Sequence, residues 1–158
     1  MIKIFYCLFL SFSLSFATDC MKEFKSIYDD TSEEGLFLIA SKLNDMCTKN
    51  DKTACKCYSE YIDESKQECQ KGSSIKCIIV GTMFMDNEYE SSKYAKQACD
   101  NNDGSKYSTS GCSIYGSILK SRYYKSKDAS IKKDAIFYLK KACKMGNVSS
   151  CNFLKELK

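Results

Sequence analysis

Cysteine is the residue type whose number and spacing point most directly to chemistry in this 158-residue chain. There are 11 Cys and no His. Four neighbouring pairs are separated by seven or twelve residues, at Cys47/Cys55, Cys69/Cys77, Cys143/Cys151 and Cys99/Cys112. A zinc site is disfavoured because the chain lacks both His and a Cys-x-x-Cys sequence. We therefore predict disulfides, with no metal and no cofactor.

Disulfides require an oxidising compartment, and the first 17 residues, MIKIFYCLFLSFSLSFA, indicate one. They carry a positive charge at Lys3, an apolar run from Ile4 to Leu14, and small residues at Ser15 and Ala17. This is the pattern of a secretory signal peptide, and the apolar run is shorter than the roughly 20 residues of a membrane-spanning helix. We predict export to the periplasm or the medium, cleavage near Ala17, and no stable membrane anchor.

Cleavage would remove Cys7 and leave ten cysteines, an even number that permits complete pairing. Cys20 and Cys57 have no partner at either spacing, so pairing them with each other rests on elimination. Cys55 and Cys57 could instead form a redox or metal site. An oxidising compartment favours Cys55 in its C-x7-C disulfide over that alternative.

The segment YLKKACKMGNVSSC, residues 138–151, indicates which elements would position such a pair. We expect a helix that ends at the first cysteine, a turn through Gly146 and Asn147, and a second helix that starts near Ser149. Gly and Asn most readily adopt the left-handed conformation that ends a helix, and Ser149 or Ser150 could cap the next one. The two cysteines would then lie at facing ends of antiparallel helices, within the roughly 4.4 to 6.8 Å between α-carbons that a disulfide requires.

The sequence around the cysteines repeats with a period typical of helical solenoids. CIIVGTMF at Cys77 matches CSIYGSIL at Cys112, and YAKQAC at 94–99 matches YLKKAC at 138–143. Cys77 and Cys112 are 35 residues apart, and Cys112 and Cys151 are 39 residues apart. The repeat unit is therefore expected to be a pair of helices.

Apolar residues recur at helical spacing, as at Leu36, Ala40 and Leu43, and the chain contains no Pro. The sequence predicts an all-α fold, a short α-solenoid of antiparallel helix pairs stapled by disulfides. We expect one domain over 18–158, with degenerate repeats over 18–76 and clearer repeats over 77–158. Helices are expected near 19–29, 33–47, 54–70, 75–85, 89–101, 110–124, 129–145 and 148–157.

The motif Ala-Cys-x2-Gly-x4-Cys after a Tyr-rich helix, with Cys-x3-Gly opening the next helix, resembles the cysteine-rich Sel1-like repeat proteins, the Helicobacter cysteine-rich protein family. The resemblance is best from Cys77 to Lys158, about half of the chain. The residues that carry it are Ala142, Cys143, Gly146 and Cys151, with Gly81, Ala98, Cys99, Cys112 and Gly116 in the other copy.

This resemblance implies a secreted array related to tetratricopeptide repeats, with one disulfide per repeat. It also implies that Gly81 and Gly116 let neighbouring helices pack closely, which fits a residue without a side chain. The chain departs from the family between Cys55 and Cys69, where one helix fits and the family would have two.

Some members of the resembled family are described as penicillin-binding proteins or β-lactamases, which makes Ser-x-x-Lys the motif to test. It occurs three times, at Ser73/Lys76, Ser117/Lys120 and Ser130/Lys133. Chance alone delivers about three matches in a chain so rich in Ser and Lys. The companion sequences Ser-Asp-Asn and Lys-Thr-Gly are absent, and without His there is no Ser-His or Cys-His arrangement.

The leading hypothesis is an exported scaffold that binds a protein or peptide on a concave helical surface and has no catalysis of its own. Tyr107, Tyr123 and Tyr124 are candidates for such a surface, because Tyr is enriched at recognition sites. The alternative is a β-lactamase or a penicillin-binding or peptidoglycan-fragment hydrolase that uses one of the three serines. A third hypothesis is a secreted factor recognised by host receptors.

The charge balance bears on one further class of partner. The mature chain would carry 23 Lys and Arg against 20 Asp and Glu, mixed along the sequence and with no basic stripe that stands out. This distribution argues against nucleic acid as a partner. The sequence makes no prediction of the oligomeric state.

Overall fold

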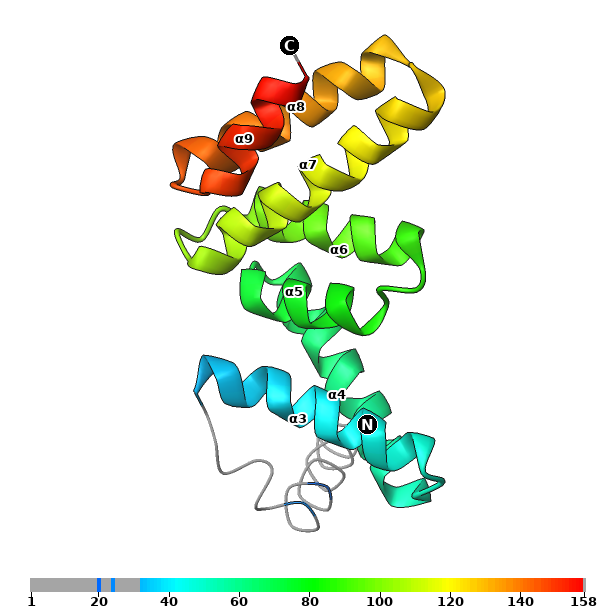
Figure 1. The fold of residues 1–158 in the computed structure, drawn as a ribbon. Helices are drawn as coiled ribbons and strands as arrows, with labels where there is room; N and C mark the ends of the chain where they lie inside the picture. The colour runs from blue at the N-terminus through cyan, green and yellow to red at the C-terminus, as the bar shows by residue number, and fades with distance from the viewer. Residues whose placement is uncertain (1–19, 21–23, 25–31, 158) are drawn as a thin grey trace, which may run out of the picture. The chain divides into compact units, whose positions relative to one another are not determined.

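The computed structural model describes Cys20, Phe24 and residues 32–157, and this part of the chain is all-helical, without strands (Figure 1). Its helices are α3 (Glu33–Thr48), α4 (Lys52–Gln70), α5 (Ser74–Met83), α6 (Glu88–Asn101), α7 (Lys106–Ser126), α8 (Ala129–Lys144) and α9 (Val148–Glu156). The predicted signal peptide and most of the helix expected over 19–29 lie outside the described residues. Within the described part, none of the helices has the length and apolar character that crossing a bilayer demands.

The chain divides into two compact units, residues 1–63 and 64–158, and α4 contributes to both. In the first unit, the apolar stripe of α3 is buried at Ile39, Ala40 and Leu43, as the helical spacing predicts. The Tyr61 hydroxyl of α4 donates a hydrogen bond of 2.8 Å to the Leu36 carbonyl oxygen of α3. This bond and a disulfide at the turn hold the two helices together.

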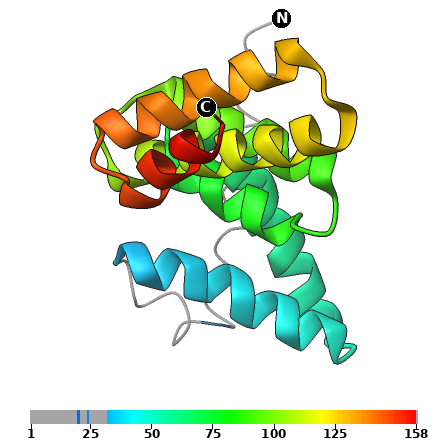
Figure 2. The same ribbon diagram turned by 45° about the horizontal axis from the view of Figure 1, so that its top comes forward.

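In the second unit, α5 to α9 form a short solenoid in which each helix packs on the next one in the chain (Figures 1 and 2). Helix α7 also contacts both α5 and α9, so these three helices form one row of the array. The core between the rows includes Leu119 of α7 and Ala135 and Leu139 of α8. The all-α solenoid predicted from the sequence is therefore confirmed for this unit.

Five disulfides staple the helices, and they join the pairs predicted from the spacing and by elimination. Their α-carbons are 4.4 to 5.5 Å apart. Four of them connect consecutive helices, namely Cys47–Cys55, Cys69–Cys77, Cys99–Cys112 and Cys143–Cys151, and the fifth joins Cys20 to Cys57. Such a set of disulfides indicates an oxidising environment outside the cytoplasm.

Helix α7 begins at Lys106, four residues before the start that we expected. Its N-cap is Ser105, whose hydroxyl accepts a hydrogen bond of 3.2 Å from the Ser108 backbone N–H. The Asp103 carboxylate in turn accepts hydrogen bonds from the Ser105 hydroxyl and backbone N–H. The connection between α6 and α7 is therefore shorter than the gap expected between residues 101 and 110, because Ser105 and Asp103 supply a helix start within it.

The turn between α8 and α9 follows the predicted path, but its caps differ from the prediction. Gly146 takes the left-handed conformation, with φ of 94°. Asn147 does not, and it is the N-cap of α9 in place of Ser149 or Ser150. Its side-chain oxygen accepts a hydrogen bond of 2.8 Å from the Ser150 backbone N–H. Asn147 succeeds as the cap because its short carbonyl side chain reaches the first free N–H groups of the helix.

The helices of the second unit approach most closely at two glycines of α7. A Cβ atom on Gly111 would lie 2.6 Å from the Ala98 Cβ atom, and one on Gly116 would lie 2.8 Å from the Leu139 Cγ atom. The role implied for Gly116 is therefore present in the structure. Gly81 also lies against the neighbouring helix, because a Cβ atom there would be 3.4 Å from the Tyr94 Cβ atom of α6, which is an ordinary contact distance. Gly111 was not predicted.

Candidate functional site

An open groove lies on the α5–α7 row of the second unit. Its volume is about 180 Å³. Ile78 and Thr82 of α5, Met85 just beyond α5, Ala95 of α6 and Ile114 of α7 form most of its lining, which is predominantly apolar. A hollow of this size accepts one aliphatic or aromatic side chain.

The groove is hollow because its floor is built from the smallest residues. Gly81 has no side chain, and Ala95, only 3% exposed, contributes a single methyl group. Larger apolar side chains stand at the edges, where Met85 is 70% and Ile114 is 39% exposed. Exposed apolar side chains beside a hollow mark an interaction site more often than isolated ones do.

Polar contacts fix the walls of the groove relative to one another. The Ser74 hydroxyl of α5 donates a hydrogen bond of 3.0 Å to the Ala98 carbonyl oxygen of α6. The Ser74 backbone N–H donates to the Asp103 carboxylate, also at 3.0 Å. Both groups of Ser74 are buried, so these bonds hold the start of α5 against the end of α6.

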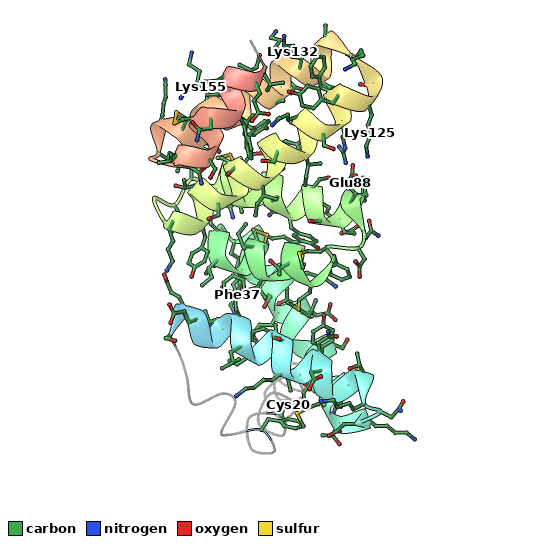
Figure 3. All side chains as sticks on the ribbon, in the orientation of Figure 1. Cys20, Phe37, Glu88, Lys125, Lys132 and Lys155 are labelled. Atoms are coloured by element: carbon green, nitrogen blue, oxygen red, sulfur yellow. A yellow bond between two sulfur atoms is a disulfide. The ribbon has the colours of Figure 1, made fainter. Side chains whose placement is uncertain are left out.

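Arg122 links α7 to the first turns of α6, where Glu88 lies (Figure 3). Its Nε atom is 2.7 Å from a carboxylate oxygen of Glu88, and its Nη2 atom donates to the Ser92 hydroxyl at 3.3 Å. Hydrogen bonding from Arg122 lowers the pKa of the Glu88 carboxyl. The ion pair therefore persists to a lower pH than an isolated glutamate would allow.

The carboxyl ends of α4 and α6 are closed by the same kind of hydrogen bond, from a side chain to the carbonyl oxygen of a disulfide cysteine. The Cys69 carbonyl oxygen of α4 accepts hydrogen bonds from the side-chain amides of Gln97 and Asn101 of α6. In the same way, the Cys99 carbonyl oxygen of α6 accepts a hydrogen bond of 2.8 Å from the Lys141 ammonium of α8. At these two helix ends, the carbonyl oxygen of a disulfide cysteine is thus satisfied by a side chain two helices further along the chain.

Of the three predicted Ser-x-x-Lys pairs, Ser117 and Lys120 are both engaged in structural contacts through their side chains. The Ser117 hydroxyl donates to the Ser113 carbonyl oxygen of its own helix at 2.8 Å, and the Lys120 ammonium pairs with the Glu156 carboxylate. Ser130 lies in the first turn of α8, where its backbone N–H donates to the Asp128 cap. Both side chains of the Ser117 pair are therefore already engaged with groups other than each other.

The remaining pair, Ser73 and Lys76, is the one with a perturbed amine. Ser73 is the N-cap residue of α5, but its hydroxyl makes no capping hydrogen bond. Burial lowers the pKa of the Lys76 ammonium, and the charges of Glu64 and Glu68 partly offset that effect. A lysine with a lowered pKa can accept a proton from a serine hydroxyl more readily than an exposed one.

The tyrosines singled out from the sequence divide between core and surface. Tyr107 is wrong as a surface candidate, because it is buried at 9% exposure. Tyr123 packs against the apolar core of α7 and α8. Tyr124 is 42% exposed, and its hydroxyl donates to the Glu156 carbonyl oxygen. Of the three, only Tyr124 is an exposed residue.

The Cys-x-Cys alternative is also answered by the structure, because Cys55 pairs with Cys47 and Cys57 with Cys20. Among the described residues, no group of three or more His, Cys, Asp or Glu is placed to hold a metal ion.

The groove itself was not predicted. Ile114 corresponds in the repeat to Ile79, which is completely buried, so the alignment of the two copies predicted a core residue at this position. One signal in the sequence could have indicated that the second copy is more exposed here. Ile78 of the first copy corresponds to Ser113 of the second, one position before Ile114, so the two copies differ in polarity.

The chain matches no protein-family model. No curated protein and no solved structure matches it either. Its function is therefore inferred from the groove and from the surroundings of the predicted residues.

Proposed function

We propose that this chain is an exported, disulfide-stapled α-solenoid of the Sel1-like repeat type that binds a protein or peptide. In this proposal, the groove on the α5–α7 row receives an apolar side chain of the ligand. The observation that carries it is the apolar hollow over Gly81 and Ala95, bordered by the exposed side chains of Met85 and Ile114.

The rigidity of the walls supports binding over a purely structural role. Ordering a flexible surface around a ligand costs conformational entropy, and a surface already fixed by bonds avoids much of that cost. The hydrogen bonds of Ser74 and the Cys99–Cys112 disulfide fix α5, α6 and α7 before any ligand arrives. Repeat arrays in general present such extended surfaces to their partners.

Selection from a random peptide library against the oxidised protein tests this function. We expect enriched peptides to share an aliphatic or aromatic anchor. Met85→Arg and Ile114→Arg should each weaken binding about tenfold or more, because burying one such anchor contributes about 1.5–3 kcal/mol. Leu38→Arg is the matched control, since Leu38 is 43% exposed on α3 and outside the groove. Groove variants that bind as tightly as this control would refute the proposal.

The proposed location of the protein is the periplasm or the medium, after cleavage of a signal peptide near Ala17. The five disulfides support an oxidising destination. The mass of the protein recovered from each cell fraction tests both points. A protein that retains residues 1–17 in the cytoplasm would contradict them.

A second candidate function is a serine acyl transfer on a β-lactam or a related amide, with Ser73 as nucleophile and Lys76 as base. The lowered pKa of the Lys76 amine favours this pair over the other two. Hydrolysis of a chromogenic cephalosporin by the oxidised protein tests it. Activity that Ser73→Ala abolishes and Ser130→Ala leaves intact would establish the enzyme. Turnover that neither change affects, or no turnover at all, would rule out acyl transfer by Ser73.

A further inference from the structure

Helix α8 carries a stripe of basic residues that the groove does not involve. Lys133, Phe137, Lys140 and Lys144 follow one another at intervals of four, three and four residues, so they share one face of the helix. All four are exposed, and Phe137 is 60% exposed. The face of α8 formed by Ala135, Leu139 and Ala142 is fully buried, so the stripe is a ridge on the outside of the array.

The lysines of this stripe are not neutralised by neighbouring acids. Among the described residues, no carboxylate lies within ion-pair distance of Lys133, Lys140 or Lys144. The equivalent helix of the preceding repeat differs, because on α6 Lys96 pairs with Asp100. In the alignment of YAKQAC with YLKKAC, Asp100 corresponds to Lys144.

The charge of the surrounding helices strengthens the stripe. Residues 106–157 contain eleven Lys or Arg and only three Asp or Glu, whereas residues 64–105 contain five and seven. Lys125, Lys132 and Lys155 place three of these cations on α7, α8 and α9 (Figure 3). The stripe is therefore part of a wider basic region of the second unit, and a positive potential of this extent attracts an anionic partner.

We propose that the exposed face of α8 docks on the anionic surface of a lipid bilayer. The three lysine ammonium groups would contact anionic headgroups, and the Phe137 ring would enter the boundary between headgroups and acyl chains. Charge complementarity selects an anionic partner, and the exposed aromatic ring in the centre of the stripe selects one with an apolar layer beneath its charges. A ridge without a groove also fits a flat surface better than it fits a peptide.

This docking is independent of the groove and would hold the array at a membrane surface through α8. The Phe137 ring is already oriented, because it packs edge-on against the Tyr138 ring with centroids 5.1 Å apart. Insertion of a pre-positioned ring loses less side-chain entropy than insertion of a free one.

The test uses the exported protein with its disulfides intact and its amino terminus determined. Its partition is measured by flotation with phosphatidylcholine vesicles and with vesicles that also contain phosphatidylglycerol. We expect binding to the anionic vesicles only. The triple variant K133Q/K140Q/K144Q should bind about a hundredfold less, because each lysine near an anionic surface contributes separately. The control K42Q/K49Q/K52Q removes the same charge from α3 and α4 and should bind as the unchanged protein does.

A second variant separates a bilayer from a soluble polyanion. Phe137→Ser should weaken binding to the anionic vesicles about tenfold and leave binding to polyglutamate unchanged. Equal binding to neutral and anionic vesicles, or equal loss in the two triple variants, would overturn the proposal. A Phe137→Ser protein that binds the vesicles normally would overturn it too, because the stripe would then serve an acidic macromolecule.

Discussion

Gly111 of α7 lies directly against Ala98 of α6, so close that a Cβ atom on Gly111 would be 2.6 Å from the Ala98 Cβ atom and 2.7 Å from the Ala95 carbonyl oxygen. Each of the two residues directly precedes one partner of the Cys99–Cys112 disulfide, whose α-carbons are 4.5 Å apart. The close approach of the helices and the disulfide therefore depend on each other. The same approach places Ile114 at the edge of the groove.

Replacing Gly111 by Ala should destabilise the protein. The added methyl group would meet backbone as well as side-chain atoms, so α6 and α7 would have to separate at a cost of about 1–3 kcal/mol. Denaturant unfolding measures the change. Gly81→Ala is the matched control, since its methyl group fits at 3.4 Å and Ala favours a helix over Gly by about 1 kcal/mol. Equal destabilisation by both changes would contradict the account.

The Lys141 ammonium should stabilise the array through the Cys99 carbonyl oxygen. Lys141→Met keeps most of the aliphatic side chain and removes the hydrogen bond of 2.8 Å, which leaves the helix end unsatisfied. We expect a loss of about 1–3 kcal/mol in the free energy of unfolding, the range for a bond to a charged group. Lys140→Met, at the exposed neighbouring position, should change stability little. A larger loss of stability in Lys140→Met than in Lys141→Met would show that the hydrogen bond does not stabilise the end of α6.

The disulfides should be reduced in an order that follows their burial. Cys69, Cys77, Cys99 and Cys112 are completely buried, whereas the cysteines of Cys47–Cys55 and Cys143–Cys151 are partly exposed. Reduction requires a thiolate to reach a sulfur atom, so the two partly exposed disulfides should open first under mild reductant. Alkylation followed by peptide mass spectrometry gives the order. In denaturant we expect the disulfides to be reduced without this order. If the same order persisted there, it would be caused by the sequence around each cysteine and not by burial.

Lys76 should titrate below the ordinary pKa of a lysine, and Lys71 should titrate above it. Burial lowers the pKa of Lys76, whereas the hydrogen bond from Lys71 to Glu68 raises the pKa of Lys71. Carbon NMR of methylated lysines measures both. Between its native and ordinary pKa, Lys76 holds fewer protons in the folded than in the unfolded state, so its contribution to stability increases as pH rises. Lys71 contributes the opposite slope, because its stabilisation is lost as pH rises past its ordinary pKa.

The result of that titration can be checked by substitution. Lys76→Gln should remove the increase of stability with pH in the alkaline range, and it should leave the titration of Lys71 nearly unchanged. An unchanged pH profile in this variant would mean that the amine of Lys76 is as well solvated as an exposed lysine.

The disulfide pairs and the approximate helix positions could be predicted from the sequence because they depend on local spacing. Eight cysteines lie at helix ends, and C-x7-C spans a turn whose geometry Gly146 shows directly. The start of α7 could not be predicted in the same way. The polar stretch before Cys112 could form either a loop or the first turns of a helix. The helix forms because the Ser105 hydroxyl caps its first turn.

The groove depends on tertiary packing, which the repeat in the sequence conceals. Ile79 and Ile114 are equivalent in the alignment, yet one is fully buried and the other is 39% exposed. Gly111 has Lys76 as its counterpart, so the repeat gave no reason to expect a close contact there. The spacing of Lys133, Phe137, Lys140 and Lys144 places them on one face of a helix, but only the packing of α8 shows that this face is exposed.

Methyl NMR of a peptide titration tests the central claim, binding in the groove, most directly. A peptide selected on the oxidised protein is added while the methyl resonances of Ile78, Met85 and Ile114 are followed. Val148, 72% exposed on α9, serves as the reference. We predict saturable shifts of the three groove residues and no shift of Val148. Saturation without any change at Ile78, Met85 and Ile114 would place the ligand elsewhere and contradict the proposed function.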